Sequence, residues 1–297
     1  ALGGGSVMDC AKAIAVMATN DGVLWDYVAV GSGKGLPIPN TPLPIVAITT
    51  TAGTGSETDS AGVITKEDTY EKAFIGAPSL YPCIAVVDPE LMLSVPASFT
   101  AFQGFDALFH SIEGYIANGA NLMSDMYALT AIENLAKYLP RAVQDGNNLE
   151  ARTHVAFGNT LSGVVMCLTL ITSEHGMEHA LSAYHPNLPH GAGLIMISRA
   201  YFSYFVRNHA CDERFIRMAQ VMGMPDADKP EDFITALTHL QEACGVADLK
   251  MSDYGIAFDE AEKFMRNARE VMGVMFTSDR VQMTDADIVR IYEESWR

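Results

Sequence analysis

The chain of 297 residues has no Cys-x-x-C pair and no surplus of basic residues. Its five cysteines lie at wide, irregular spacing, at Cys10, Cys83, Cys167, Cys211 and Cys244. Such spacing argues against a disulfide framework or a thiolate metal site, and it is typical of proteins kept in a reducing compartment. We therefore expect a cytoplasmic location.

Positive charge is scarce as well. Nineteen Lys and Arg stand against 36 Asp and Glu, which gives a formal net charge of −17. This charge repels phosphate backbones and anionic membrane surfaces. A long uncharged stretch, Thr153 to Ser173, is interrupted by polar residues such as His154 and Asn159. We expect it to be a buried helix rather than a membrane span, and we expect neither nucleic acid nor a membrane as a partner.

The length and a hydrophobic content of 49% predict about two domains with a sizeable core. A helix is expected from Ser6, with Ser6 and Asp9 as a capping box. The apolar run Ile45 to Ile48 favours a strand buried on both faces. Further strands are expected at residues 62–65, 72–75 and 83–87. These patterns predict an α/β class for residues 1–92.

Beyond Pro96 the apolar residues recur at intervals of three and four, the pattern of helices. The segments with this pattern are 97–118, 122–139, 150–172, 191–206, 211–222, 230–244 and 258–273. Few strand signals lie between them. We therefore predict an all-helical second domain at residues 93–297.

Two loops of small residues are candidate cofactor sites. Gly3-Gly4-Gly5-Ser6 precedes a predicted helix, where free backbone N–H groups and the helix dipole favour a phosphate. The loop from Thr50 to Glu57 leaves a strand at the edge of the sheet where ligands bind in α/β folds. It also suits a tight turn stabilised by its own hydroxyl groups. The two loops together favour a phosphate-bearing ligand.

The histidines carry a sharper signal. Asp106 and His110 are four residues apart, so both leave one face of a predicted helix. His175 and His179 repeat this spacing, and His190 opens the next helix after a break at Pro186 and Pro189. Each histidine alone suits a structural role, and His185 is ambiguous. Together, imidazole and carboxylate donors favour a Zn²⁺ or Fe²⁺ site, at which three His and one Asp leave room for a substrate oxygen.

These motifs resemble a known family. G-G-G-S-x-x-D, T-T-x-G-T-G-S-E, D-A-L-x-H-x-x-E-G-Y and H-G-x-x-H-A-L…P-H-G occur here in series, from Gly3 to Gly193. In this order they closely resemble the iron-containing (group III) alcohol dehydrogenases. The resemblance implies the dehydroquinate synthase-like fold of that family, with a Rossmann-like dinucleotide-binding domain followed by an all-α metal-binding domain.

The resemblance also implies roles for single residues. The metal ligands would be Asp106, His110, His175 and His190. The turn that receives the dinucleotide pyrophosphate would comprise Gly4, Gly5, Ser6 and Asp9, and the loop beside nicotinamide would supply Thr49, Thr50 and Thr54. Lys72 would reach the cofactor ribose. His179 would lie near the substrate as a catalytic residue rather than a ligand.

The expected activity is hydride transfer between a primary alcohol or aldehyde and NAD or NADP, with Fe²⁺, or else Zn²⁺, in the site. Two alternatives are open: a glycerol dehydrogenase-like polyol oxidoreductase, or a metal-dependent hydrolase that uses the same ligands to activate water. The resemblance implies a homo-oligomer. Only Ala1 and Leu2 precede Gly3, whereas the family places strands there. We therefore expect the dinucleotide-binding domain to be incomplete here, without its N-terminal segment.

Overall fold

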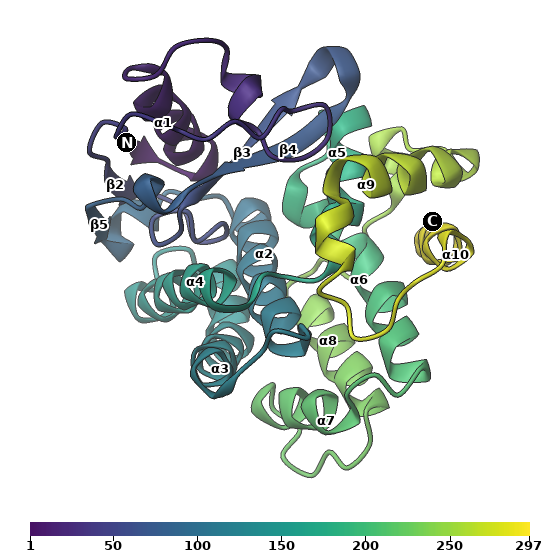
Figure 1. The fold of residues 1–297 in the computed structure, drawn as a ribbon. Coiled ribbons are helices and arrows are strands. Elements are labelled where there is room, and N and C mark those ends of the chain that lie inside the picture. Colours follow the sequence, from purple (N-terminus) through teal and green to yellow (C-terminus); the bar gives the residue numbers. More distant parts are fainter.

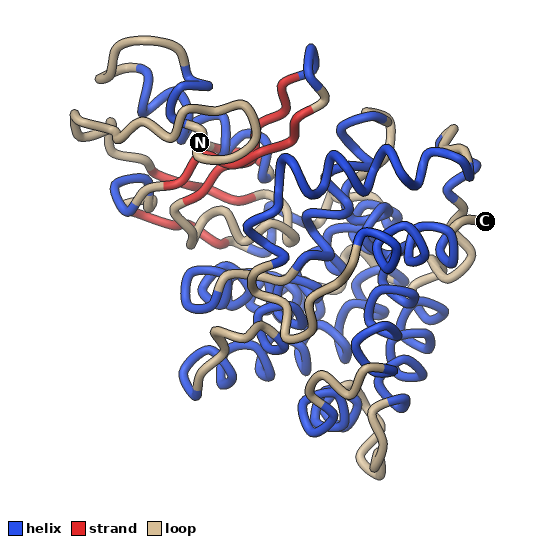
Figure 2. The backbone as a smooth tube through the Cα atoms, turned by 45° about the vertical axis from the view of Figure 1, so that its right-hand side comes forward, coloured by secondary structure: helices blue, strands red, loops and turns tan.

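The computed structural model describes residues 1–297, in which a small α/β part precedes a larger helical part (Figures 1 and 2). The strands are β1 (Leu2–Gly3), β2 (Val46–Thr49), β3 (Ala61–Lys66), β4 (Glu71–Gly76) and β5 (Ile84–Val87). The helices are α1 (Gly5–Met17), α2 (Ala97–Ile116), α3 (Leu122–Gln144), α4 (Leu149–Thr169), α5 (Ser173–Tyr184), α6 (His190–Arg207), α7 (Asp212–Val221), α8 (Glu231–Ala243), α9 (Ala261–Phe276) and α10 (Asp285–Ser295). The predicted fold class, α/β followed by all-α, is confirmed.

The strands form two sheets. β1, β2 and β5 are parallel and lie in that order, with Leu2 beside Ile48 and Val46 beside Ile84. β3 and β4 form a separate antiparallel hairpin, which packs against α1 on one side and against α5 and α9 on the other (Figure 1). The predicted strands are confirmed, but β2 is not buried on both faces, because Val46 is 40% exposed. The hairpin reaches across the boundary between the two parts.

The start of α1 differs from the prediction. The helix begins at Gly5 with Gly4 as its cap, and no side chain caps it. Ser6 is exposed, and the Asp9 carboxylate bonds to Ser56 Oγ at 2.6 Å and to the backbone N–H of Val63 at 2.9 Å. The predicted capping box is therefore wrong, because tertiary contacts draw Asp9 away from the helix end.

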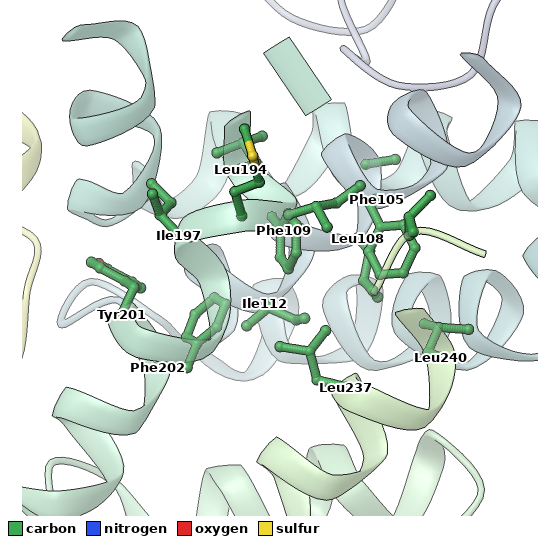
Figure 3. Packing of buried hydrophobic residues seen from close by; sticks show 14 of the residues in the cluster. Phe105, Leu108, Phe109, Ile112, Leu194, Ile197, Tyr201, Phe202, Leu237 and Leu240 are labelled. Atoms are coloured by element: carbon green, nitrogen blue, oxygen red, sulfur yellow. The ribbon is translucent and has the colours of Figure 1, made fainter. Parts of the chain in front are cut away.

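The core of the helical part lies around α2, which is buried over almost its whole length. A helix that is apolar on all sides must be covered on all sides, and α3, α4 and α6 pack around this one. Figure 3 shows its side chains Phe105, Leu108, Phe109 and Ile112 against Leu194, Ile197, Tyr201 and Phe202 of α6 and Leu237 and Leu240 of α8. This packing fixes the helix that carries Asp106 and His110.

Two helices differ from the sequence interpretation. The stretch from Thr153 to Ser173 is not one buried helix: α4 leaves Phe157 46% exposed and ends before Leu170, whose positive φ of 60° belongs to the break before α5. No single helix is long and apolar enough to cross a bilayer, and α4 with α5 passes that test only as a pair bent by 110°. The sequence interpretation missed α10, although Thr284 and Asp287 form a capping box at its start.

Candidate functional site

Helix α2 supplies two of the predicted metal ligands. Asp106 and His110 lie one turn apart and are both buried. His110 Nδ1 is 3.5 Å from Asp106 Oδ1. The spacing of four residues therefore brings the two side chains together, as predicted.

His175 and His190 come from the two helices that follow α4. His175 lies in the first turn of α5, whose end is held by Asp279: Ser173 donates to this carboxylate from its backbone N–H at 3.1 Å and from its hydroxyl at 2.7 Å. His190 is the first residue of α6, directly after Pro189. The predicted helix break between them is confirmed.

One carboxylate oxygen is the focus of the cluster. Asp106 Oδ1 lies 3.2 Å from His175 Nε2 and 3.6 Å from His190 Nε2. The donor atoms of Asp106, His110 and His175 all lie within 4.8 Å of one another. The structure thus brings three of the predicted ligands, Asp106, His110 and His175, into one candidate metal site. The fourth, His190, lies beside Asp106 but groups with Glu178 and His179.

Two glutamates that the sequence interpretation missed hold the histidine rings. Glu113 of α2 accepts a hydrogen bond from His175 Nδ1, and Glu178 of α5 bonds to His190 Nδ1. Such carboxylates fix the ring so that Nε2 faces the metal. A signal was present, because Glu113 follows His110 by three residues and Glu178 follows His175 by three, which places each on or near the ligand face of its helix.

The electrostatics of the cluster suit a divalent cation. His110 Nδ1 is buried without a hydrogen-bond partner. Burial and the neighbouring His175 lower the pKa of His110 to about 3, so its ring is neutral. Burial opposes charge on His175, but Glu113 and Asp106 raise its pKa to about 10. The cluster therefore favours a positive charge at its centre, and its nitrogen and oxygen donors are those that Fe²⁺ and Zn²⁺ accept.

His179 and Lys72 lie beside this cluster. His179 Nδ1 donates to the backbone carbonyl of Lys72 at 3.2 Å, which leaves Nε2 as an acceptor. Lys72 Nζ lies 2.9 Å from Ser182 Oγ and 3.2 Å from His190 Nδ1. The structure thus places the amine of Lys72 next to a predicted metal ligand, and the ribose contact expected of Lys72 stays a prediction.

The two glycine-rich loops pack against each other. A Cβ on Gly5 would lie 2.5 Å from Thr54 Cγ2, and one on Gly4 would lie 3.0 Å from Thr51 Oγ1. Gly55 has a φ of +64°, and a Cβ there would lie 2.7 Å from the Gly163 backbone. These glycines are needed for close approach and for a left-handed backbone, so the second loop is held directly over the start of α1.

A buried lysine ties the same loop to α1. Lys12 Nζ donates to Ser56 O and Oγ at 2.8 Å each, to Asp59 Oδ1 at 2.7 Å and to Ala61 O at 2.6 Å. Its side chain has no exposed surface. The sequence interpretation missed Lys12, although a lysine three residues after Asp9 on a mostly apolar helix face was a signal.

One cavity of about 640 Å³ connects the start of α1 with the histidine cluster. The predicted site residues that line it are Gly5, Ser6, Asp9, Thr54, Lys72, Asp106, His110, His175, His179 and His190. Gly4, Thr49 and Thr50 are not among its lining residues. Thr49 is fully buried and its hydroxyl donates to Thr51 O at 2.8 Å, so the structure does not support its predicted cofactor contact.

Comparison with known proteins finds family matches along almost the whole chain. Residues 1–89 match the iron-containing alcohol dehydrogenase family, and residues 100–296 match the C-terminal domain of the Fe-containing alcohol dehydrogenase family. An NAD-dependent methanol dehydrogenase from Bacillus methanolicus is 33% identical over 283 residues, which are 91% of this chain and 70% of that protein. The relatives extend beyond the match, since the chain spans between 44% and 75% of their lengths.

Solved structures of alcohol dehydrogenases and an aldehyde reductase have a similar fold. An archaeal halo-thermophilic alcohol dehydrogenase from a Red Sea brine pool aligns with a TM-score of 0.92 at 31% identity, over 99% of this chain and 76% of the other. A sulfoacetaldehyde reductase from Bifidobacterium kashiwanohense, solved with NAD⁺, aligns with a TM-score of 0.83 at 30% identity, over 99% of this chain and 74% of the other.

Proposed function

This chain belongs to the iron-containing alcohol dehydrogenase family, and we propose that it transfers a hydride between a primary alcohol or aldehyde and NAD. The observation that carries the proposal is that one continuous cavity reaches from the N-terminus of α1 to the cluster of Asp106 and the three histidines. A hydrolase needs only the metal-binding cluster, whereas a dehydrogenase also needs a site for the cofactor phosphates, such as the N-terminus of α1. NAD rather than NADP is proposed because the similar methanol dehydrogenase is NAD-dependent and the similar sulfoacetaldehyde reductase binds NAD⁺.

Asp106, His110, His175 and His190 would hold the metal, with iron as the proposed ion. A divalent cation bound there supplies Lewis acidity that lowers the pKa of a substrate hydroxyl or polarises a carbonyl. The protein's own contribution is to orient the donors: Glu113 and Glu178 hold the rings of His175 and His190. Zn²⁺ accepts the same donors, so metal identity is part of the test.

The other end of the cavity would bind the cofactor phosphates. Gly5 and Ser6 line the cavity, and their backbone N–H groups belong to the positive end of α1. Thr54 lines the same end. A dinucleotide bound by Gly5, Ser6 and Thr54 would share this cavity with the histidines, and holding cofactor and substrate in one cavity would favour hydride transfer between them.

His179 would handle the proton. Its Nδ1–H is committed to Lys72 O, so Nε2 is the atom that accepts a proton from the substrate hydroxyl. Burial and the charge of Lys72 lower its pKa well below the ordinary value, so the ring is neutral near pH 7. A neutral imidazole can accept a proton at Nε2 and pass it on to water.

The test is cofactor-dependent turnover. The chain, loaded with Fe²⁺ or Zn²⁺ in separate samples, is mixed with NADH and a series of primary aldehydes, and NADH absorbance is followed. We expect oxidation of NADH that depends on aldehyde, on metal and on the four ligands. NADH oxidation that proceeds equally without added metal or without aldehyde would contradict the proposal. So would a hydrolytic activity that does not depend on NADH.

A further inference from the structure

The geometry points to an uncharged aliphatic substrate: we infer that the cavity selects alcohols and aldehydes with an apolar chain of about four to six carbons over small polar or charged ones. The inference rests on the proposed function and names its substrate class. It depends on three observations, which are an apolar wall beside the ligand helix, the absence of any uncommitted charge in the cavity, and the residue type that forms the wall.

The wall lines the same cavity as the predicted metal ligands. Its members, called the methionine wall here, are Leu24, Phe74, Met166, Ile171, Met272 and Met275. They belong to one apolar cluster, separate from the main core, that joins the hairpin, the end of α4 and helix α9. All six line the cavity.

Glycine at position 176 brings the wall to the site. A Cβ on Gly176 would lie 3.1 Å from Met272 Cβ and 3.6 Å from Met275 Sδ. Gly176 follows His175 directly, so these two methionines lie against the turn of α5 that carries a ligand. Met272 departs from helical geometry, with φ −117° and ψ 24°, so α9 kinks where it meets this turn.

The charged groups of the cavity are already engaged. Lys72 is its one lysine, no arginine lines it, and the amine of Lys72 contacts Glu178, Ser182 and His190. Asp9 bonds through both oxygens to Ser56 and Val63, and Asp59 is paired with Lys12 at 2.7 Å. An anionic or cationic substrate tail would therefore lose its hydration without gaining a partner.

The methionines of the wall determine the range of substrate chain lengths that the cavity accepts. The unbranched, flexible thioether fills irregular space and adapts to chains of different length. We therefore expect the affinity for substrate to rise with each added methylene group, without a strict requirement for one chain shape. Burial of one methylene corresponds to about a fourfold gain in affinity.

The experiment compares kcat/KM for ethanal, butanal, hexanal, 3-hydroxypropanal, sulfoacetaldehyde and betaine aldehyde in the metal-loaded protein with NADH. We expect a gain of about fourfold per methylene, on the order of 10²-fold from ethanal to hexanal. 3-Hydroxypropanal and both charged aldehydes should fall below butanal. Equal or better use of 3-hydroxypropanal or of a charged aldehyde would overturn the inference and, for the former, favour a polyol oxidoreductase.

Variants of α9 distinguish the effect of the wall residue Met275 from that of a methionine outside the cavity. Met275→Gln places an amide in the wall and should reduce the ratio of hexanal to ethanal kcat/KM at least tenfold, whereas Met275→Leu should preserve it. The matched control is Met265→Gln on the same helix, a half-buried methionine outside the cavity, which should leave the ratio unchanged. An unchanged ratio in a folded Met275→Gln protein would contradict the assignment of the wall.

A binding measurement keeps this inference distinct from the proposed function. Isothermal titration of the metal-free chain with 1-hexanol and with 1,3-propanediol requires no turnover. We expect tighter binding of 1-hexanol, and weaker binding of it by Met275→Gln. If no aldehyde is reduced but 1-hexanol binds as expected, the proposed function fails and the apolar site stands. If aldehydes are reduced without chain-length preference, or 1-hexanol binds no better than the diol, the inference fails.

Discussion

Asp106 Oδ1 lies 3.2 Å from Nε2 of His175, across 69 positions of sequence. The second nitrogen of the same ring is bonded to Glu113, so the ring is held between two carboxylates. This arrangement leaves the ring one orientation and explains why α2 and α5 must be packed accurately for a metal to bind. It also ties metal affinity to residues that touch no metal.

Removal of a ligand should abolish metal binding. We expect Asp106→Ala and His175→Ala to lose bound metal and activity while remaining helical by circular dichroism. Elemental analysis after reconstitution measures the metal. His209→Ala is the control, since that side chain is 73% exposed and pairs with Asp212, which is not part of the cluster. Full metal occupancy in either ligand variant would remove that residue from the site.

Loss of a ring-holding carboxylate should weaken metal binding without abolishing it. Glu113→Gln keeps the shape of the side chain but no longer carries the charge that polarises His175. The expected loss is roughly 10- to 100-fold in metal affinity, measured by competition with a chelator of known affinity. Glu150→Gln is the control, because Glu150 is exposed and bonds to Arg141. Equal affinities in the two variants would show that Glu113 has no such role.

His179 should affect turnover rather than metal content. We expect His179→Ala to retain the metal and to lose roughly 10²-fold or more in kcat, because the substrate proton loses its acceptor. Metal analysis and steady-state kinetics across pH measure the two effects. His239→Ala, an exposed histidine on α8, should behave as wild type. A wild-type rate in His179→Ala at every pH would exclude a catalytic role.

The buried Lys12 should be a large contributor to stability. Lys12→Met leaves Asp59 buried without its partner and leaves two carbonyls unsatisfied, which should reduce the free energy of unfolding by about 3–5 kcal/mol. Urea denaturation measures this loss. Lys34→Met, at a lysine that is 65% exposed, should change it by less than about 1 kcal/mol. A loss below about 1 kcal/mol for Lys12→Met would contradict the prediction.

Asp279 should make stability depend on pH. Burial raises its pKa from 3.8 to about 7. Between about pH 4 and pH 7 the folded chain therefore holds a proton that the unfolded chain releases, so this group's contribution to stability falls as pH rises, by up to about 1.4 kcal/mol per pH unit. Asp279→Asn removes the titration while retaining one acceptor oxygen for Ser173.

The difference in unfolding free energy between wild type and Asp279→Asn isolates this group from all others. We expect wild type to lose stability relative to the variant as pH rises from 5 to 7, and no further change above about pH 8. Asp253→Asn, at an exposed aspartate, should show no such trend. A difference that stays constant with pH, or rises, would show that Asp279 is ionised in the folded protein.

Much of the fold followed from local pattern. The periodicity of three and four residues predicted most of the helices from 97 to 273 because each buries one or more faces against neighbours, and short apolar runs predicted β2 to β5 but not β1. Helix ends were less accurate: Ser6 does not cap α1, because Asp9 finds Ser56 and Val63 instead. The pairing of β3 with β4 apart from the other strands was not predictable from either strand alone.

Local sequence spacing was enough to predict which residues share a helix face. Asp106 with His110, and His175 with His179, are neighbours by spacing alone, since the period of the α-helix is fixed by backbone geometry. The packing of whole helices brings these pairs together and places Glu113 and Glu178 against the histidine rings. It also turns Lys72 toward His190 and brings the methionines of α9 to the site. Those contacts join residues far apart in the chain, and their geometry depends on how whole helices pack, which no local spacing encodes.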